Sequence, residues 1–225
     1  MNKDQIIHSV GWFDTEHDAG SPSVRLRLDG TVVYFDPALL RNYPQAPDAD
    51  VICISHPHDD HCDVESIIRL KTGRTEIVTN AVVAEKIGPN VSDSRLHVLS
   101  VGETVDVCGV TVRAVPSYET ESIVHKKEFG YTGFLVSSGE DTVYFSGDAG
   151  NMTEFEEFPD GIDVALLCVR TGDPYLMLDH MDGFARTVAP SVIVPVHWRD
   201  FEKAAVEEKG KRIPVHTEFV LLDRI

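Results

Sequence analysis

The sequence predicts an α/β (α+β) sandwich of four layers, αββα, in which two mixed β-sheets pack together and helices flank them. Three pairs of apolar, β-branched runs are each joined by a short turn, which indicates β-hairpins. Segments with helix start and stop signals lie among these hairpins. At 225 residues the chain can bury one generous core, so we expect a single domain over 1–225.

The elements follow from local signals. The expected hairpins turn at Asp29-Gly30, at Cys108-Gly109 and within 137–141, because Gly and Asp accept the backbone angles of tight turns. Their strands are 24–28 with 32–35, 105–107 with 110–115, and 134–136 with 143–145. Further strands are expected at 51–55, 163–168, 192–196 and 219–222. Helices are expected at 63–70 with Asp63 as N-cap, 81–87, 177–188 stopped by Pro190, and 201–209 ended by Gly210.

The composition excludes some functions. The formal charge is −17, from 37 acidic and 20 basic residues, so a large surface that binds the phosphate backbone of nucleic acids is not expected. The basic clusters, Lys126-Lys127 and 209–212, are short and typical of solvated loops. No stretch approaches the length of a membrane span, and the start lacks the apolar region of a signal peptide. Four cysteines without a CxxC pair suit a reducing compartment, so we expect a soluble cytoplasmic protein.

The segment SHPHDDHCD, residues 55–63, places three histidines and two aspartates within six positions. Its histidines come just after the apolar run 51–55, so these side chains stand at a strand end. Pro57 favours extended backbone before it, so His56 and His58 can face one metal ion. Asp60 and His61 point in other directions just before a helix, which favours a second ion beside the first.

Polar residues follow four of the expected strands. Asp36, His56, Asp148 and His197 each come at or shortly after the end of an apolar run. Each alone is compatible with a turn or a surface residue. Together they predict ligands that converge on one edge of the sheets, where a rigid scaffold presents chemistry.

These residues resemble the signature of the metallo-β-lactamase fold superfamily. HPHDDH matches HxHxDH, and YFDP, YFSGDAG and IVPVHW supply Asp36, Asp148 and His197 in the expected order over about 24–198. The segments VRAVPSYET and DVALLCV most resemble the sequences of small stand-alone metal-dependent hydrolases, which include the ascorbate-phosphate lactonase-like group. The resemblance implies a four-layer αββα sandwich with a metal centre.

The resemblance also implies a ligand set. His56 and His58 would bind the first metal, Asp60, His61 and His197 the second, and Asp148 would bridge them. Relatives usually supply a third histidine to the first metal from the loop after a strand such as 110–115, yet here that loop begins Pro-Ser-Tyr-Glu. His125 or Glu119 could take this place, since imidazole and carboxylate both suit zinc or manganese. If neither does, the enzyme would run on one ion.

Further residues are candidates for the chemistry. Asp60 can orient the nucleophile, and His125 or His180 could donate a proton to the leaving group. His180 is also consistent with a plain residue at the N-terminal end of a helix. The resemblance makes His17 a candidate too, because relatives often carry a polar residue from that early loop near the pocket. Asp36 is expected to orient ligands rather than bind metal.

The expected activity is hydrolysis of an ester, lactone or phosphodiester in a small-molecule substrate by a metal-bound hydroxide. The cofactor would be one or two zinc ions, with Mn²⁺ or Fe²⁺ as alternatives. Two other functions stay open: an iron-dependent oxidoreductase on the same fold, and a metal-stabilised binding protein without catalysis. Trp198 and Phe201, expected to be exposed beside His197, could line a pocket or join subunits of a homo-oligomer.

Overall fold

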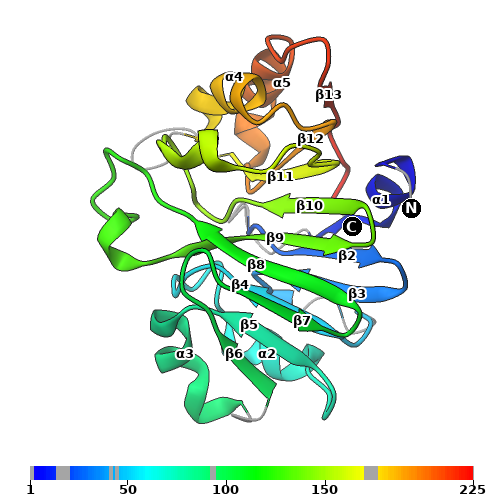
Figure 1. The fold of residues 1–225 in the computed structure, drawn as a ribbon, viewed down its shortest axis with the longest axis vertical. Helices are drawn as coiled ribbons and strands as arrows, with labels where there is room; N and C mark the ends of the chain where they lie inside the picture. Colours follow the sequence, from blue (N-terminus) through cyan, green and yellow to red (C-terminus); the bar gives the residue numbers. More distant parts are fainter. Residues whose placement is uncertain are drawn as a thin grey trace.

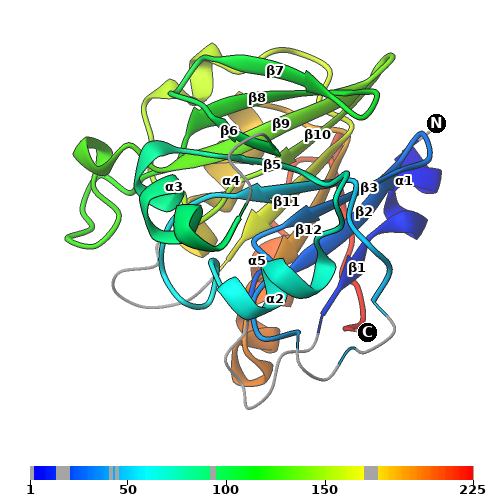
Figure 2. The same cartoon turned by 90° about the horizontal axis from the view of Figure 1, so that it is seen from below.

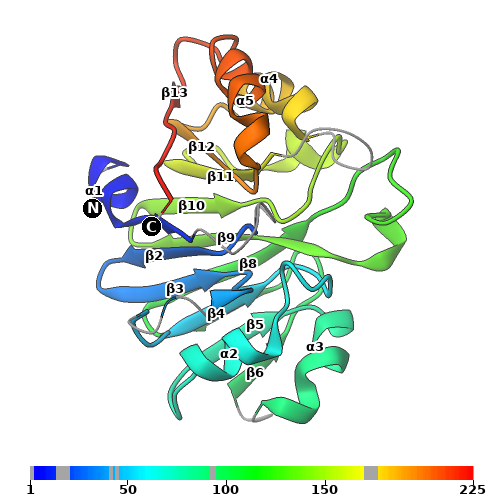
Figure 3. The ribbon, with the colours of Figure 1, turned by 180° about the vertical axis from the view of Figure 1, so that it is seen from behind.

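The computed structural model describes residues 3–13, 21–40, 43, 46–91, 95–169 and 177–224. It contains two mixed β-sheets packed face to face, with α2 and α3 at one end of the view in Figure 1 and α4 and α5 at the other. Figure 3 shows the same arrangement from behind. The predicted αββα sandwich is therefore confirmed.

The first sheet has six strands that lie in chain order from β1 to β6. The pairs β1–β2 and β2–β3 are antiparallel, and the pairs from β3 to β6 are parallel. The strands are β1 (Gly11–Trp12), β2 (Val24–Leu28), β3 (Thr31–Phe35), β4 (Val51–Ile54), β5 (Glu76–Thr79) and β6 (Leu96–Val98).

The second sheet has seven strands in the order β13-β12-β11-β10-β9-β8-β7. Its antiparallel half runs from β7 to β10, and its parallel half from β10 to β13. The strands are β7 (Thr104–Val107), β8 (Val110–Pro116), β9 (Thr132–Ser138), β10 (Asp141–Phe145), β11 (Val164–Cys168), β12 (Val192–Val196) and β13 (Glu218–Phe219).

The hairpin turns follow the sequence signals. Asp29 and Gly30 have φ of 48° and 93°, and Cys108 and Gly109 have φ of 48° and 80°. Two consecutive positive φ angles are what a two-residue hairpin turn requires. The third turn is shorter than expected, because β9 and β10 extend their ladder until Ser138 pairs with Asp141.

The helices are α1 (Lys3–Ser9), α2 (Val64–Leu70), α3 (Ala81–Ile87), α4 (Met177–Thr187) and α5 (Lys203–Gly210). Asp63 caps α2 as expected, since its side chain accepts a hydrogen bond from the Glu65 amide. The helix expected at 201–209 begins later, because a 3₁₀ turn (Asp200–Glu202) precedes α5. Among the described residues, no helix has the length and apolar character needed to cross a membrane.

Apolar side chains fill the space between the sheets and beneath the helices. Phe35 of β3 stacks on Phe145 of β10 with 4.8 Å between ring centroids, which joins the two sheets. On the outer face of the first sheet, α2 and α3 bury Ile67 and Val83 in a second cluster with Ile52. This packing fixes the ends of β3, β4, β10 and β12 relative to one another.

One buried polar group in this core is unsatisfied. The Tyr144 ring stacks on Phe184 and meets Phe158 edge to face, but its hydroxyl has no hydrogen-bond partner in the described part of the chain. We expect Tyr144→Phe to raise the free energy of unfolding by about 1 kcal/mol, because a buried hydroxyl without a partner is destabilising. Urea denaturation measures this change.

Tyr34→Phe is the matched control. The Tyr34 ring is equally buried, but its hydroxyl donates a hydrogen bond to the Pro47 carbonyl at 2.8 Å. Its removal is expected to lower the free energy of unfolding by about 1 kcal/mol. If Tyr144→Phe destabilised the protein as much as Tyr34→Phe, Tyr144 would have a hydrogen-bond partner.

Candidate metal centre

The four polar residues that follow strands in the sequence lie together in the structure. Asp36 Oδ2 is 2.7 Å from His61 Nδ1, and Asp148 Oδ1 is 3.2 Å from His61 Nε2. His197 Nε2 is 3.4 Å from Asp148 Oδ1, and His56 Nε2 is 3.9 Å from Asp148 Oδ2. The ends of β3, β4, β10 and β12 therefore meet at one edge of the sandwich, as the sequence predicted.

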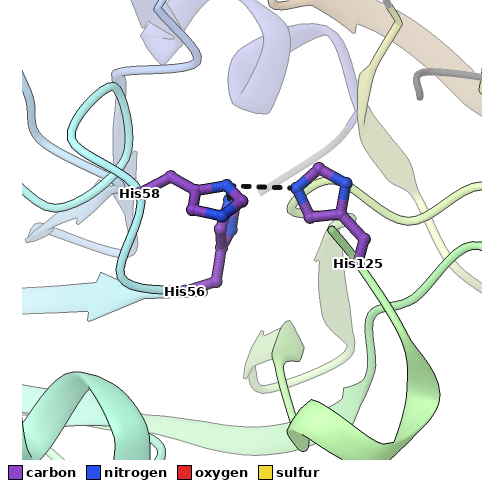
Figure 4. A group of neighbouring side chains, drawn as sticks. All are labelled: His56, His58 and His125. Atoms are coloured by element: carbon purple, nitrogen blue, oxygen red, sulfur yellow. Dashed lines mark hydrogen bonds between the residues drawn. The ribbon is translucent and has the colours of Figure 1, made fainter. Parts of the chain in front are cut away.

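A first trio of side chains consists of His56, His58 and His125. Their ligand atoms all lie within 4.8 Å of one another, and the three rings point toward a common centre in Figure 4. The Nε2 atoms of His56 and His125 are 3.0 and 3.2 Å from His58 Nδ1. Three converging imidazole nitrogens are a typical set for a zinc-like ion.

The loop between β8 and β9 delivers the third histidine. His125 is buried, its amide donates to Ser122 Oγ at 3.0 Å, and its carbonyl accepts from the Glu119 amide at 2.9 Å. The Glu119 carboxylate accepts from the amides of Asn151 and Glu121 at 2.6 and 3.2 Å. Of the two candidates for the missing position, His125 joins the trio and Glu119 braces its loop.

A second trio consists of Asp60, His61 and His197. The Nε2 atoms of His61 and His197 are 3.2 Å apart, and His197 Nε2 is 3.6 Å from Asp60 Oδ2. Both histidines are fully buried, whereas the Asp60 side chain is 28% exposed. A carboxylate with two imidazoles also suits a divalent ion. At Asp60, this second trio is open to solvent.

Asp148 stands between the two trios. Its Oδ2 faces His56 and His125, with the His125 Nε2 at 3.3 Å, and its Oδ1 faces His61 and His197. The side chain is 3% exposed, and neither oxygen has a hydrogen-bond partner among the described residues. A buried carboxylate is stabilised by cations or hydrogen bonds, so this placement fits a pair of metal ions, one on each side.

The pKa shifts differ between the two trios: that of His61 is raised, whereas those of His56, His58 and His125 are lowered. Burial acts to lower the pKa of His61, but the Asp148 and Asp60 carboxylates outweigh it and hold the pKa well above its usual value. Burial acts to raise the pKa of Asp148, but His61 and His197 hold it well below its usual value. Burial lowers the pKa of His125 to about 4, so this imidazole is neutral at neutral pH with a lone pair for a metal.

Asp36 orients two of the histidines. Its Oδ2 accepts from His61 Nδ1, and its two oxygens accept from the Ser55 amide at 2.6 Å and the Ser55 hydroxyl at 2.5 Å. The Ser55 oxygen can then accept from His56 Nδ1 at 2.9 Å. These contacts leave Nε2 of both rings directed at the trios, which agrees with the orienting role expected for Asp36.

The backbone at two of these positions is strained. Asp36 has φ of 43° and His197 has φ of 64°, in the left-handed region that non-glycine residues rarely adopt. Such conformations persist where the surrounding contacts hold them, and they concentrate at functional sites.

Replacing Asp36 should weaken metal binding without removing a ligand. An asparagine keeps the size of the side chain but loses the charge that holds His61 and Ser55. We expect Asp36→Asn to lower metal affinity by about 10- to 100-fold, which competition with a chromogenic chelator measures. An unchanged affinity would show that His61 and His56 are oriented without Asp36.

Other expected site residues lie elsewhere. His180 of α4 belongs to neither trio and lines a cavity of about 400 Å³ beside Asn151 and Phe184, so its role as a proton donor stays a prediction. His17 lies outside the described residues. Phe201 is 68% exposed as expected.

The expectation of an exposed Trp198 was wrong. Its side chain is 5% exposed, because it packs on Trp12 and beneath Arg224, whose guanidinium is 4.9 Å from the Trp198 ring centroid. Arg224 also donates a hydrogen bond to the Trp198 carbonyl and pairs with Asp200. Local sequence around 198 contains no sign of this contact, because its partners come from both ends of the chain.

Known proteins are similar to this chain in sequence and in architecture. The family model described as the β-lactamase superfamily domain matches residues 19–197. A UPF0173 metal-dependent hydrolase from Methanopyrus kandleri is 26% identical over 215 residues, which cover 87% of this chain and 93% of that protein.

Two solved structures show the same fold. Igni18, a metallo hydrolase from Ignicoccus hospitalis, has a TM-score of 0.73 at 18% identity, covering 95% of this chain and 94% of that one. CmlA, a diiron β-hydroxylase from Streptomyces venezuelae, has a TM-score of 0.67 at 16% identity, covering 92% of this chain and 53% of that one. The narrower likeness to the lactonase-like group stays a prediction. The family match, which spans most of the chain, confirms the resemblance drawn from HPHDDH, and the chain belongs to the β-lactamase superfamily.

Proposed function

We propose that this protein is a metal-dependent hydrolase that acts on an ester, lactone or phosphodiester bond of a small molecule. The observation that carries the proposal is the buried Asp148 carboxylate, which presents one oxygen to each trio. The metal-dependent hydrolase from Methanopyrus kandleri supports the same class of activity.

The residues present would hold two divalent ions. His56, His58 and His125 would hold the first, Asp60, His61 and His197 the second, and Asp148 would contact both. Imidazole and carboxylate donors suit zinc, and also manganese or iron. When bound, such ions would polarise the attacked group and lower the pKa of a bound water toward neutrality.

The side chains around these ions have distinct tasks. Asp60 reaches solvent and can accept a hydrogen bond from the attacking water, which sets the direction of attack. Asp148 is buried and held by opposite charges, so it stays ionised. Because His125 lies in the first trio, we assign it as a ligand and retain His180 as the candidate proton donor.

A small substrate suits the charge of the chain. At −17 the protein repels polyanions such as nucleic acids at long range. A single ester or phosphodiester carries at most a small charge, which the metal ions would offset locally. A cytoplasmic location and a homo-oligomeric assembly stay predictions.

The test measures metal content and hydrolysis on the full chain purified without added metal. Bis(p-nitrophenyl) phosphate, a simple lactone and p-nitrophenyl acetate are supplied with Zn²⁺, Mn²⁺ or Fe²⁺. We expect hydrolysis of at least one probe, lost in His61→Ala and retained in His97→Ala, whose ring pairs with Glu76 away from both trios.

Two outcomes would overturn the proposal. Protein that carries two irons with a visible absorption band, and that hydrolyses no probe, would indicate an oxidoreductase. If no probe reacts with any ion, and His61→Ala changes only stability, the site would serve structure or binding.

A further inference from the structure

A cavity of about 440 Å³ lies on the outer face of β8 and β9, away from the core. Arg113 of β8 is exposed and pairs with Leu135 of β9, so Leu135 and Val115, which line the cavity, lie on the same outer face of the sheet, although both side chains are buried. No described α-helix covers this part of the sheet in Figures 1 and 2. The volume is that of a small-molecule site. From its volume, its aromatic walls and an arginine at its edge, we propose that this pocket binds a small aromatic carboxylate.

The floor and walls of the pocket are apolar. Val115 and Leu135 form the floor, and Tyr118, Tyr131 and Phe158 stand around it. These side chains come from the two strands, from the loop that carries His125 and from the segment after β10. Aromatic walls around an aliphatic floor favour a flat, apolar body, because such a body buries its faces against the rings.

A guanidinium at the edge of the pocket supplies the polar contact. Arg113 is exposed on β8 directly opposite Leu135, and its guanidinium makes no hydrogen bond or ion pair with any described residue. Its planar fork matches a carboxylate with two parallel hydrogen bonds. The pocket therefore has one unpaired cation next to its apolar floor.

The remaining charges limit the ligand to a single negative charge. Lys127 pairs with Glu154, which also accepts a hydrogen bond from the Tyr118 hydroxyl. Glu157 lies on the same rim and adds a second carboxylate. Lys127 therefore has no surplus charge to offer, and a dianion would meet repulsion that a monocarboxylate avoids.

The pocket neighbours the metal centre without including it. The Tyr131 ring centroid is 5.2 Å from that of His56 and 6.3 Å from that of His125, and Tyr131 is the wall that the two sites share. None of the seven candidate ligands lines the pocket. The proposed site is thus a second site, and it stands whether or not the protein is a hydrolase.

The test uses 2-naphthoate, a flat monocarboxylate, and its neutral analogue 2-naphthamide. Calorimetric titration of the full chain is expected to show 2-naphthoate binding, with 2-naphthamide about tenfold weaker. Arg113→Gln is expected to weaken 2-naphthoate by about tenfold and to leave 2-naphthamide unchanged. The matched control Arg186→Gln removes an exposed arginine of α4 that is absent from the pocket.

Location is read from amide chemical shifts in NMR spectra. The proposal predicts that the largest changes on adding 2-naphthoate fall on β8, β9 and the 127–131 segment. Absence of binding, or equal binding by Arg113→Gln and wild type, would overturn it. Binding that disappears with a chelator and shifts residues 56–61 instead would place the carboxylate on the metal centre and would also overturn it.

Discussion

Asp148→Asn is expected to remove both metal ions and to lower the rate of hydrolysis by more than about 100-fold. The amide keeps the shape of the side chain but loses the negative charge that faces His56 and His125 on one side and His61 and His197 on the other. Elemental analysis after dialysis measures the metal, and the probe that the wild type hydrolyses best measures the rate.

The control for this change is Asp160→Asn. It removes the same charge from an exposed position outside both trios, so metal content and rate should match the wild type. If Asp148→Asn kept both ions, the Asp148 carboxylate would not be needed to hold either of them. The proposed role of Asp148 between two ions would then be wrong.

His125→Ala is expected to have the second largest effect. The first site would keep His56, His58 and the Asp148 carboxylate, and the loss of one of three imidazoles weakens the binding of a zinc-like ion strongly. We expect metal content to fall from about two ions per chain to about one, and the rate to fall by about 100-fold. The second trio does not include His125, so its ion should remain.

Two further variants serve as controls for His125→Ala, because neither residue is expected to bind a metal ion. His97→Ala removes a histidine that pairs with Glu76 and should keep both ions. Glu119→Gln preserves the length of the side chain that braces the loop, and it too should keep both ions. If Glu119→Gln lost one ion and His125→Ala lost none, the carboxylate would be the third ligand of the first site.

Most of the candidate metal centre could be predicted because several of its residues follow strands. A strand end is fixed by the sheet, so His56, Asp148 and His197 had to lie near one edge once the sheets were correctly ordered. The density of histidines in HPHDDH then indicated the chemistry. In these positions, local sequence and global geometry carry the same information.

The third histidine could not be chosen in this way. His125 lies nine residues beyond the end of β8, in a loop whose path depends on contacts of Glu119 with Asn151 and of Ser122 with His125. No periodicity describes such a loop. The short elements β1, β6 and α1 were missed for a related reason, because they are stabilised by their neighbours rather than by their own patterns. The strand β5 was also missed, although its β-branched run Ile77-Val78-Thr79 is typical of a buried strand.

The two trios and Asp148 between them come from both sheets of the sandwich. His56, His58, Asp60 and His61 follow β4 of the first sheet, whereas His125, Asp148 and His197 follow β8, β10 and β12 of the second. An ion in either trio would thus cross-link the two sheets, as a disulfide links distant parts of a chain. Binding and folding are then thermodynamically linked, and the melting temperature should rise with free metal concentration. Metal supply would set how long the folded enzyme survives as well as whether it works.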